Sequence, residues 1–274
     1  MAKRKIMKGK GLFILVFLTG FLSFLPGKTG AQVLEKLHQD LSASVTLDFN
    51  SKYVWRGITW VDDMVFQPDF SLSFKYLSLG VWQNVAFTDS FDEGGVGTSP
   101  ASTEVDYYMD YSGEYRILSY SMGWIYYQFP HTGINHTQEI YATLGLGIFL
   151  NPAVTLYADV DDNSGGLYWN FALSHDFELD GLTLTPSFGL GICNTTFTSY
   201  YTGVNKESSH LMDMNFGLNM AVPLGGFFEK LGGTMNLHAN YSMFPDGSVR
   251  DQIKEQSLDN KDAFYAGLGF SFGF

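Results

Sequence analysis

The sequence predicts an all-β protein, a transmembrane up-and-down antiparallel β-barrel of about twelve strands. Three observations support this fold class. Apolar and polar residues alternate along segment after segment, the connections between segments alternate between short and long, and the chain begins with a segment typical of exported proteins. Alternation places successive side chains on opposite faces of a strand. A membrane barrel turns its apolar face to lipid and its polar face inward.

The N-terminal segment predicts a secretory signal peptide over residues 1–31. Basic residues precede an apolar run from Gly11 to Pro26, and residues 29–31 are small enough for cleavage. The run is shorter than the ~20 residues that a membrane-spanning helix needs. The predicted mature chain, residues 32–274, forms one outer-membrane β-barrel.

The charge balance disfavours nucleic acid as a partner. The chain holds 16 Lys and Arg against 28 Asp and Glu. The charged residues among residues 1–31 are all basic, so their removal leaves a mature chain that is more acidic still. Because Cys193 is alone, the sequence predicts neither a disulfide framework nor a cysteine-based metal cluster, and it indicates no cofactor.

The alternating segments recur at strand length along the whole chain. Their ranges are 41–56, 66–75, 79–87, 104–111, 118–127, 139–150, 154–161, 167–174, 182–192, 212–222, 235–241 and 264–274. Pro68 and Pro186 fall inside two of them, and we expect bulges or strand ends there because proline cannot donate to a ladder.

The connections differ systematically in length. Short ones are predicted near residues 77–78, 113–114, 151–152 and 180–181, and long ones span about 57–65, 88–103, 130–138, 194–209 and 244–262. Outer-membrane barrels place short turns in the periplasm and long loops outside. An extra hairpin within residues 194–210 would raise the count to about fourteen strands. A soluble sandwich or lipocalin-like barrel is the alternative, but the polar faces are rich in Gly, Asn and Asp rather than in core residues.

The last stretch, "FYAGLGFSFGF" at residues 264–274, carries a predicted assembly signal. Phe270, Phe272 and Phe274 share its apolar face up to the terminal residue. We expect outer-membrane lipid to cover this face and the barrel-assembly machinery to recognise it.

Several stretches, taken in order, resemble a known family. They are "SKYVWRGITW" at 51–60, "FQPDFSLSF" at 66–74, "LGVWQN" at 79–84, "EVDYYMDYSGEY" at 104–115, "WIYYQFP" at 124–130, "TQEIYATLGLG" at 137–147 and "DVDDNSGGLYW" at 159–169. Over residues 44–274 the chain resembles the TorF family of proposed porins, a Gram-negative conserved-hypothetical barrel family. The resemblance implies an outer-membrane barrel that passes small solutes, and it does not fix which solute.

The predicted pore-lining residues are mostly acidic. The alternation of each strand assigns its residues to the inner or the outer face of the barrel. The charged residues assigned to the inner face are Asp48, Asp69, Glu104, Asp106, Asp110, Glu139, Asp159, Asp161, Asp176 and Asp213, together with the basic residues Lys52, Arg56 and Lys75. Rings of carboxylates favour cations over anions. The sequence therefore predicts a passive diffusion channel for small hydrophilic solutes with a weak cation preference. Arg56 could pair with Asp48 or Asp69 across the lumen or narrow the channel, but an ordinary ion pair in the barrel wall is favoured for it.

Two other functions stay open at this point. Inward aromatic residues could close the lumen and leave a plugged structural or adhesive barrel that acts through its extracellular loops. An outer-membrane hydrolase is less favoured, because Ser174, His175 and Asp176 are adjacent on a strand and His175 would face away from both neighbours. His238 faces inward and is the other candidate. The acidic stretch at 159–166 lacks the ligand spacing of an EF-hand, so no metal site is predicted.

Replacing Phe274 with Asp is expected to lower the yield of assembled protein without preventing export, because the substitution removes an apolar anchor at the membrane interface. The measurement is the amount of heat-modifiable protein in the outer-membrane fraction. An unchanged yield would contradict the predicted role of the terminal residue.

Overall fold

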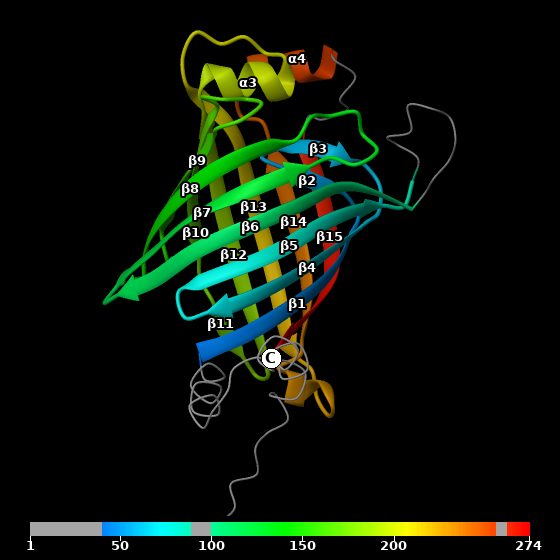
Figure 1. Cartoon of the computed structure of the whole chain (residues 1–274), viewed down its shortest axis with the longest axis vertical. Helices are drawn as coiled ribbons and strands as arrows, with labels where there is room; N and C mark the ends of the chain where they lie inside the picture. The colour runs from blue at the N-terminus through cyan, green and yellow to red at the C-terminus, as the bar shows by residue number, and fades with distance from the viewer. Residues whose placement is uncertain (1–39, 89–99, 256–261) are drawn as a thin grey trace, which may run out of the picture.

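A computed structural model describes residues 40–88, 100–255 and 262–274. The predicted signal peptide lies outside these residues. Within the described part, the strands form a closed antiparallel barrel of 12 strands, as predicted (Figure 1). In chain order the barrel strands are β1 (Leu41–Asn50), β4 (Val65–Phe74), β5 (Leu77–Ala86), β6 (Ala101–Tyr115), β7 (Leu118–Gln128), β8 (Thr137–Leu146), β9 (Ala153–Asp159), β10 (Leu167–Ser174), β12 (Leu182–Cys193), β13 (His210–Pro223), β14 (Thr234–Met243) and β15 (Asp262–Gly273).

The barrel closes between its first and last strands. β1 pairs with β15, and at the edge of that seam the backbone N–H of Phe274 donates to the carbonyl of Ala43 at 2.9 Å. The short strand β11 (Phe177–Leu179) continues the line of β10 along β12. The break between β10 and β11 lies opposite Pro186, whose missing N–H interrupts the ladder there. At Pro68 the pairing of β4 with β5 is likewise interrupted, without a change of register.

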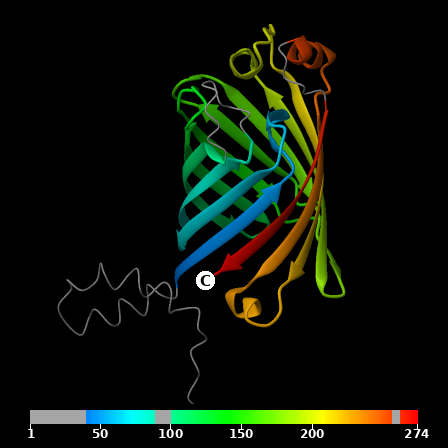
Figure 2. The same cartoon turned by 90° about the vertical axis from the view of Figure 1, so that its right-hand side faces the viewer.

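The two ends of the barrel differ (Figures 1 and 2). One end, here called the long-loop end, carries the small strands β2 (Tyr53–Trp55) and β3 (Ile58–Val61) and the helices α3 (Thr195–Thr202) and α4 (Gly247–Glu255). The other, the short-turn end, carries the C-terminus, the start of β1 and the 3₁₀ turn η1 (Phe228–Leu231). No helix of the described residues is long and apolar enough to cross a membrane.

Two predicted turns and one predicted alternative need correction. The turns lie at residues 75–76 and 116–117 rather than 77–78 and 113–114. Both turns begin with a basic residue in the left-handed region, Lys75 at φ 55° and Arg116 at φ 58°. Turns are usually located in a sequence by Gly and Asn, so these two turns were misplaced. Residues 194–209 contain α3 rather than an extra hairpin.

A belt of large apolar side chains covers the outer face of the strands. Its exposed members include Phe70, Leu79, Met109, Met122, Ile140, Leu144, Phe171, Phe216 and Leu218. Continuous apolar surface on this scale is unfavourable in water, whereas it suits the hydrocarbon band of a bilayer.

Tyrosine rings on the inner wall lie over glycines of the neighbouring strand. The ring of Tyr108 on β6 covers Gly80 on β5, and that of Tyr141 on β8 covers Gly123 on β7. The Tyr141 hydroxyl then reaches past β7 to donate to Asp110 on β6 at 2.6 Å. The inward glycines therefore leave room for aromatic rings that cross-link every second strand.

Replacing Gly123 with Ala is expected to destabilise the barrel by about 1–3 kcal/mol, the usual effect of overpacking. The new Cβ would meet the backbone oxygen of Met109 at 2.5 Å and the ring of Tyr141. Gly189→Ala is the matched control, because its nearest neighbour, the Asn215 Cβ, is at an ordinary 3.7 Å. Denaturant unfolding in detergent measures both free energies. Equal effects of the two substitutions would contradict this account of the inner wall.

Candidate functional site

The connection between β1 and β4 folds back into the barrel. β2 and β3 pair as a hairpin, and Trp55 lies opposite Ile58. We call residues Tyr53–Val61 the inner hairpin. Its tip reaches strands remote from β1 and β4, since Arg56 contacts β8 and Gly57 lies against β13. The predicted first strand is therefore too long: β1 ends at Asn50, and the chain beyond it crosses the lumen.

The tip of the inner hairpin is a two-residue turn. Arg56 (φ 49°) and Gly57 (φ 83°) both adopt the left-handed conformation, as a type I′ hairpin turn requires. This conformation costs a non-glycine residue about 1–2 kcal/mol, so tertiary contacts must hold Arg56 there. Gly57 is needed for close approach as well, because a Cβ would lie 2.8 Å from the Cβ of Asp213.

Arg56 forms a buried two-point ion pair with Glu139 on β8. Its Nη1 and Nη2 donate to the two carboxylate oxygens, each at 2.7 Å. The Tyr127 hydroxyl donates to the same carboxylate at 2.8 Å. Only 6% of the Arg56 side chain and 1% of the Glu139 side chain are exposed. The expected partners Asp48 and Asp69 were wrong, because Arg56 lies on an inward loop and not on the wall.

Aromatic rings surround the Arg56 guanidinium. Its central carbon lies within 4.2–5.4 Å of the ring centroids of Trp55, Tyr168, Tyr157 and Phe197. Such rings attract a cation through their negative faces. Burial alone would lower the pKa of Arg56, but Glu139 outweighs burial and raises this pKa above its ordinary value. The guanidinium therefore stays charged inside the barrel.

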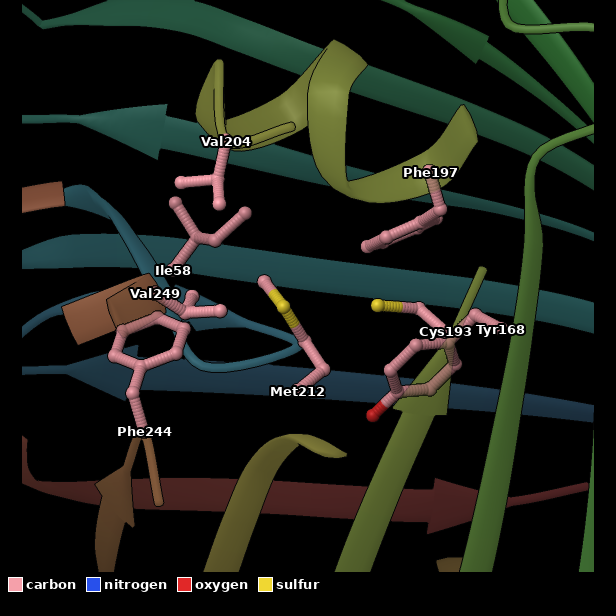
Figure 3. Packing of buried hydrophobic residues seen from close by; sticks show 8 residues of the cluster. All are labelled: Ile58, Tyr168, Cys193, Phe197, Val204, Met212, Phe244 and Val249. Carbon is pink, nitrogen blue, oxygen red and sulfur yellow. The ribbon is translucent and has the colours of Figure 1, made fainter. Parts of the chain in front are cut away.

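A small hydrophobic core seals the barrel around the inner hairpin (Figure 3). Ile58 of β3 meets residues from α3, from α4 and from the strand ends around it. The members of this core are Ile58, Tyr168, Cys193, Phe197, Val204, Met212, Phe244 and Val249. Because segments distant in sequence share one core, the inner hairpin, α3 and α4 form a packed lid at the long-loop end.

The loops of the lid are also joined by charge. Lys206, after α3, donates to Asp246, before α4, at 2.8 Å. Asp246 also accepts the backbone N–H of Ser248 at the start of α4. Burial would raise the pKa of Asp246, but the hydrogen bonds from Lys206 and Ser248 hold it below its ordinary value.

A cavity of about 470 Å³, here called the lumen cavity, lies against the inner hairpin. Its lining residues come from the hairpin and from strands all around the barrel. They are Tyr53, Val54, Trp55, Arg56, Asp69, Trp82, Asp106, Ile125, Tyr127, Tyr157, Tyr168, Asn170, Asn215 and Tyr265.

Nearer the short-turn end, the inner wall carries small polar side chains bonded along the wall. Hydroxyl pairs join neighbouring strands at Ser44 and Ser71 (2.7 Å) and at Thr143 and Thr155 (2.9 Å). Both bonds link adjacent strands along the wall. The inner hairpin, in contrast, joins opposite walls.

The predicted lining residues divide into three groups. Arg56, Asp69 and Asp106 line the lumen cavity. The acidic residues that lie on barrel strands without lining this cavity are Asp48, Glu104, Asp110, Glu139, Asp159 and Asp213. For Lys52, Lys75, Asp161 and Asp176 the predicted position on the inner face of a strand was wrong. All four residues lie beyond the strand ends.

The two lysines lie outside the strands because the chain turns there. Lys52 is between β1 and β2 and pairs with Asp62 at the base of the inner hairpin. Lys75 is in the turn after β4, half-exposed, with Asp40 at 3.5 Å. Three basic lining residues were predicted, and all three are among the described residues. Of these, Arg56 alone lies inside the barrel.

The carboxylates of the wall are held by hydroxyl donors that the sequence did not assign. Tyr168 donates to Asp213 at 2.8 Å, and Thr137 donates to Asp159 at 2.7 Å. The inner hairpin was also missed, although a signal exists. Two short β-rich stretches flank Arg56-Gly57, and this pattern is typical of a tight hairpin.

The predicted candidates for hydrolysis do not come together. His175 packs against the rings of Phe149 and Phe177, while Asp176 accepts a hydrogen bond from Thr185 at 2.6 Å. His238 forms a 2.6 Å hydrogen bond with Asn50. Among the described residues, no group of three or more His, Cys, Asp or Glu side chains is arranged to hold a metal ion.

Comparison with known proteins adds a family, two partial relatives and fold neighbours. The family model described as "Bacterial protein of unknown function (Gcw_chp)" matches residues 37–223. The MltA-interacting proteins of Escherichia coli K12 and Shigella flexneri are each 28% identical over 107 residues, which is 39% of this chain and 40% of theirs. The chain thus spans less than half of the length of these curated relatives.

Two solved structures are similar to this chain at low sequence identity. The NanC porin is 10% identical, with 84% of this chain and 98% of that chain covered and a TM-score of 0.50. LpxR from Salmonella typhimurium is 9% identical, with 84% and 99% covered and a TM-score of 0.45.

Removing either member of the Arg56–Glu139 pair is expected to lower the free energy of unfolding by about 3–5 kcal/mol, because a buried charge loses its partner. Arg56→Met and Glu139→Gln are the single variants. The double variant should lose clearly less than the sum, since neither charge then remains unpaired. Denaturant unfolding in detergent measures the cycle.

The exposed pair Lys52–Asp62 is the matched control on the same hairpin. Lys52→Met and Asp62→Asn should each cost less than about 1 kcal/mol, as exposed ion pairs do. Additive effects at Arg56 and Glu139, or equal effects at both pairs, would show that the buried pair does not hold the hairpin.

Proposed function

The chain belongs to the Gcw_chp family of bacterial proteins of unknown function, and we propose that it is an outer-membrane channel for small hydrophilic solutes that rests in a closed state. The observation that carries this proposal is the difference between the two levels of the lumen. One level has walls of small polar side chains, and the other is crossed by the inner hairpin.

Outer-membrane location is supported by the outer surface. A closed strand ring leaves no unpaired edge, and the exposed apolar belt runs along its strands. Both are requirements for a barrel in lipid. On this proposal the long-loop end faces outward and the short-turn end faces the periplasm, as in other barrels of this class.

Transport without catalysis is supported by the inner wall. Interior side chains near the short-turn end bond to their own neighbours, so they do not need to fill the centre of the barrel. On this proposal, the inner hairpin and its lid are what close the route through the barrel. Conduction requires the hairpin to move, and the Arg56–Glu139 pair opposes that movement.

A cation preference is supported by the charges on the inner face. Arg56 is already neutralised by Glu139, while Asp48, Asp69 and Asp110 have no basic partner among the described ion pairs. The remaining inner charge is negative, which lowers the energy of a cation there relative to that of an anion.

A plugged structural or adhesive barrel is the second candidate function, and the packed lid favours it. A core shared by α3, α4 and the inner hairpin gives the long-loop end a fixed surface. Such a surface suits contact with a partner as well as it suits closure.

Planar-bilayer recording in a KCl gradient separates the two functions. We expect little conductance from the wild type and several-fold more from a variant in which residues 53–61 are replaced by a Gly-Ser linker. Glu139→Gln should open more often than wild type, and Lys52→Met should not. The reversal potential of the open variants should indicate cation selectivity.

Two results would contradict the channel. A heat-modifiable hairpin-deleted barrel that never conducts would favour the plugged barrel. An anion-selective reversal potential would contradict the charge argument.

A further inference from the structure

We propose that the lumen cavity binds a small organic cation, an ammonium or guanidinium group carried on a flat apolar body. This deepens the proposed channel by naming a ligand class, and binding can be measured without conductance. The cavity, of about 470 Å³, falls within the usual range for small-molecule sites.

Aromatic side chains form half of the cavity lining. They are Tyr53, Trp55, Trp82, Tyr127, Tyr157, Tyr168 and Tyr265. Rings in this number provide faces for stacking and for cation–π attraction. The same lumen already holds one organic cation in this manner, since the Arg56 guanidinium lies 4.2 Å from the Trp55 ring centroid and 4.5 Å from that of Tyr157.

The polar groups at the cavity favour a hydrogen-bond donor with positive charge. Asp69 and Asp106 both line it. The Oδ1 of Asp106 is buried and accepts no hydrogen bond from any side chain or backbone group that the structure describes. A buried acceptor without a donor is unfavourable, and a ligand N–H would satisfy it.

The side chains that the structure describes next to the Asp106 Oδ1 do not donate a hydrogen bond to it. Arg56 lines the same cavity, but both of its terminal nitrogens are committed to Glu139. Glu104, two residues along the same face of β6, places a second carboxyl group beside Asp106. Two acidic side chains therefore lie together at this point of the wall, and this arrangement disfavours an anionic ligand.

An inorganic cation fits the site less well than an organic one. No group of three or more metal-ligating side chains of the required types occurs in the described ranges. Ring faces such as those of Trp82 and Tyr265 would remain unused by a bare ion. An aromatic ammonium uses both the carboxylate and the rings.

Three probes that differ in charge test the ligand class. Benzylammonium, benzyl alcohol and benzoate are titrated by calorimetry into the purified wild-type barrel in detergent. Benzylammonium should bind, benzyl alcohol should bind at least roughly tenfold more weakly, and benzoate should not bind. Binding of all three alike, or of none, would overturn the proposal.

Two variants test the location of the site. Asp106→Asn keeps the shape, removes the acceptor charge and should weaken benzylammonium binding by roughly tenfold or more. Glu114→Gln is the matched control, because it removes one charge from the same strand outside the cavity. Asp69→Asn is the second cavity variant if Asp106→Asn fails to assemble, and it should also weaken binding. Equal affinity in the cavity and control variants would place any binding elsewhere and overturn the proposal.

The outcome is separable from that of the channel. Binding without conductance in any variant would retain the cation site and refute the channel. Conductance without binding of benzylammonium would retain the channel and refute the cation site.

Discussion

The buried ion pair between Arg56 and Glu139 is the interaction on which the closed end of the barrel depends. Two charges with almost no exposure are tolerated only while each satisfies the other. The guanidinium gains two short hydrogen bonds and a surround of aromatic rings. These contacts offset the left-handed backbone of Arg56 and fix the inner hairpin against β8.

The position of this pair divides the lumen into two levels. At the level of the pair, aromatic side chains and a hydrophobic core surround the hairpin next to the lumen cavity, and Gly57 lets the hairpin pass close to Asp213. Nearer the short-turn end, hydroxyls bond along the wall instead. A barrel of 12 strands lies between small filled barrels and large water-filled ones. In this protein, the added hairpin determines how far the lumen is filled.

The strands were predictable because each one repeats a local pattern, and the turns and the site were less so. Alternation placed Phe70 and Leu72 outward without any knowledge of the partner strands. The same alternation misled at residues 51–56, because Tyr53 and Trp55 continue the phase of Phe49 although the chain has left the wall. Lys75 and Arg116 turn the chain in a conformation that their residue types disfavour.

The Arg56–Glu139 contact could not be predicted from periodicity. It joins residues 83 positions apart, and it exists only because the strand ring closes and brings β8 across from the connection after β1. The alternation did place Arg56 on the inner side, but alternation carries no information on which residue of the opposite wall lies close to it. The choice among ten inward carboxylates was settled by the geometry of the hairpin tip.

Hydrogen exchange of the wild-type protein, followed by mass spectrometry, tests the central claim most directly. If the ion pair and its core hold the inner hairpin in place, the amides of Tyr53–Val61 exchange as slowly as those of β8, and Glu139→Gln accelerates exchange in the hairpin while leaving the barrel strands unchanged. Exchange of these amides in the wild type at the rate of an exposed loop would contradict the closed barrel described here.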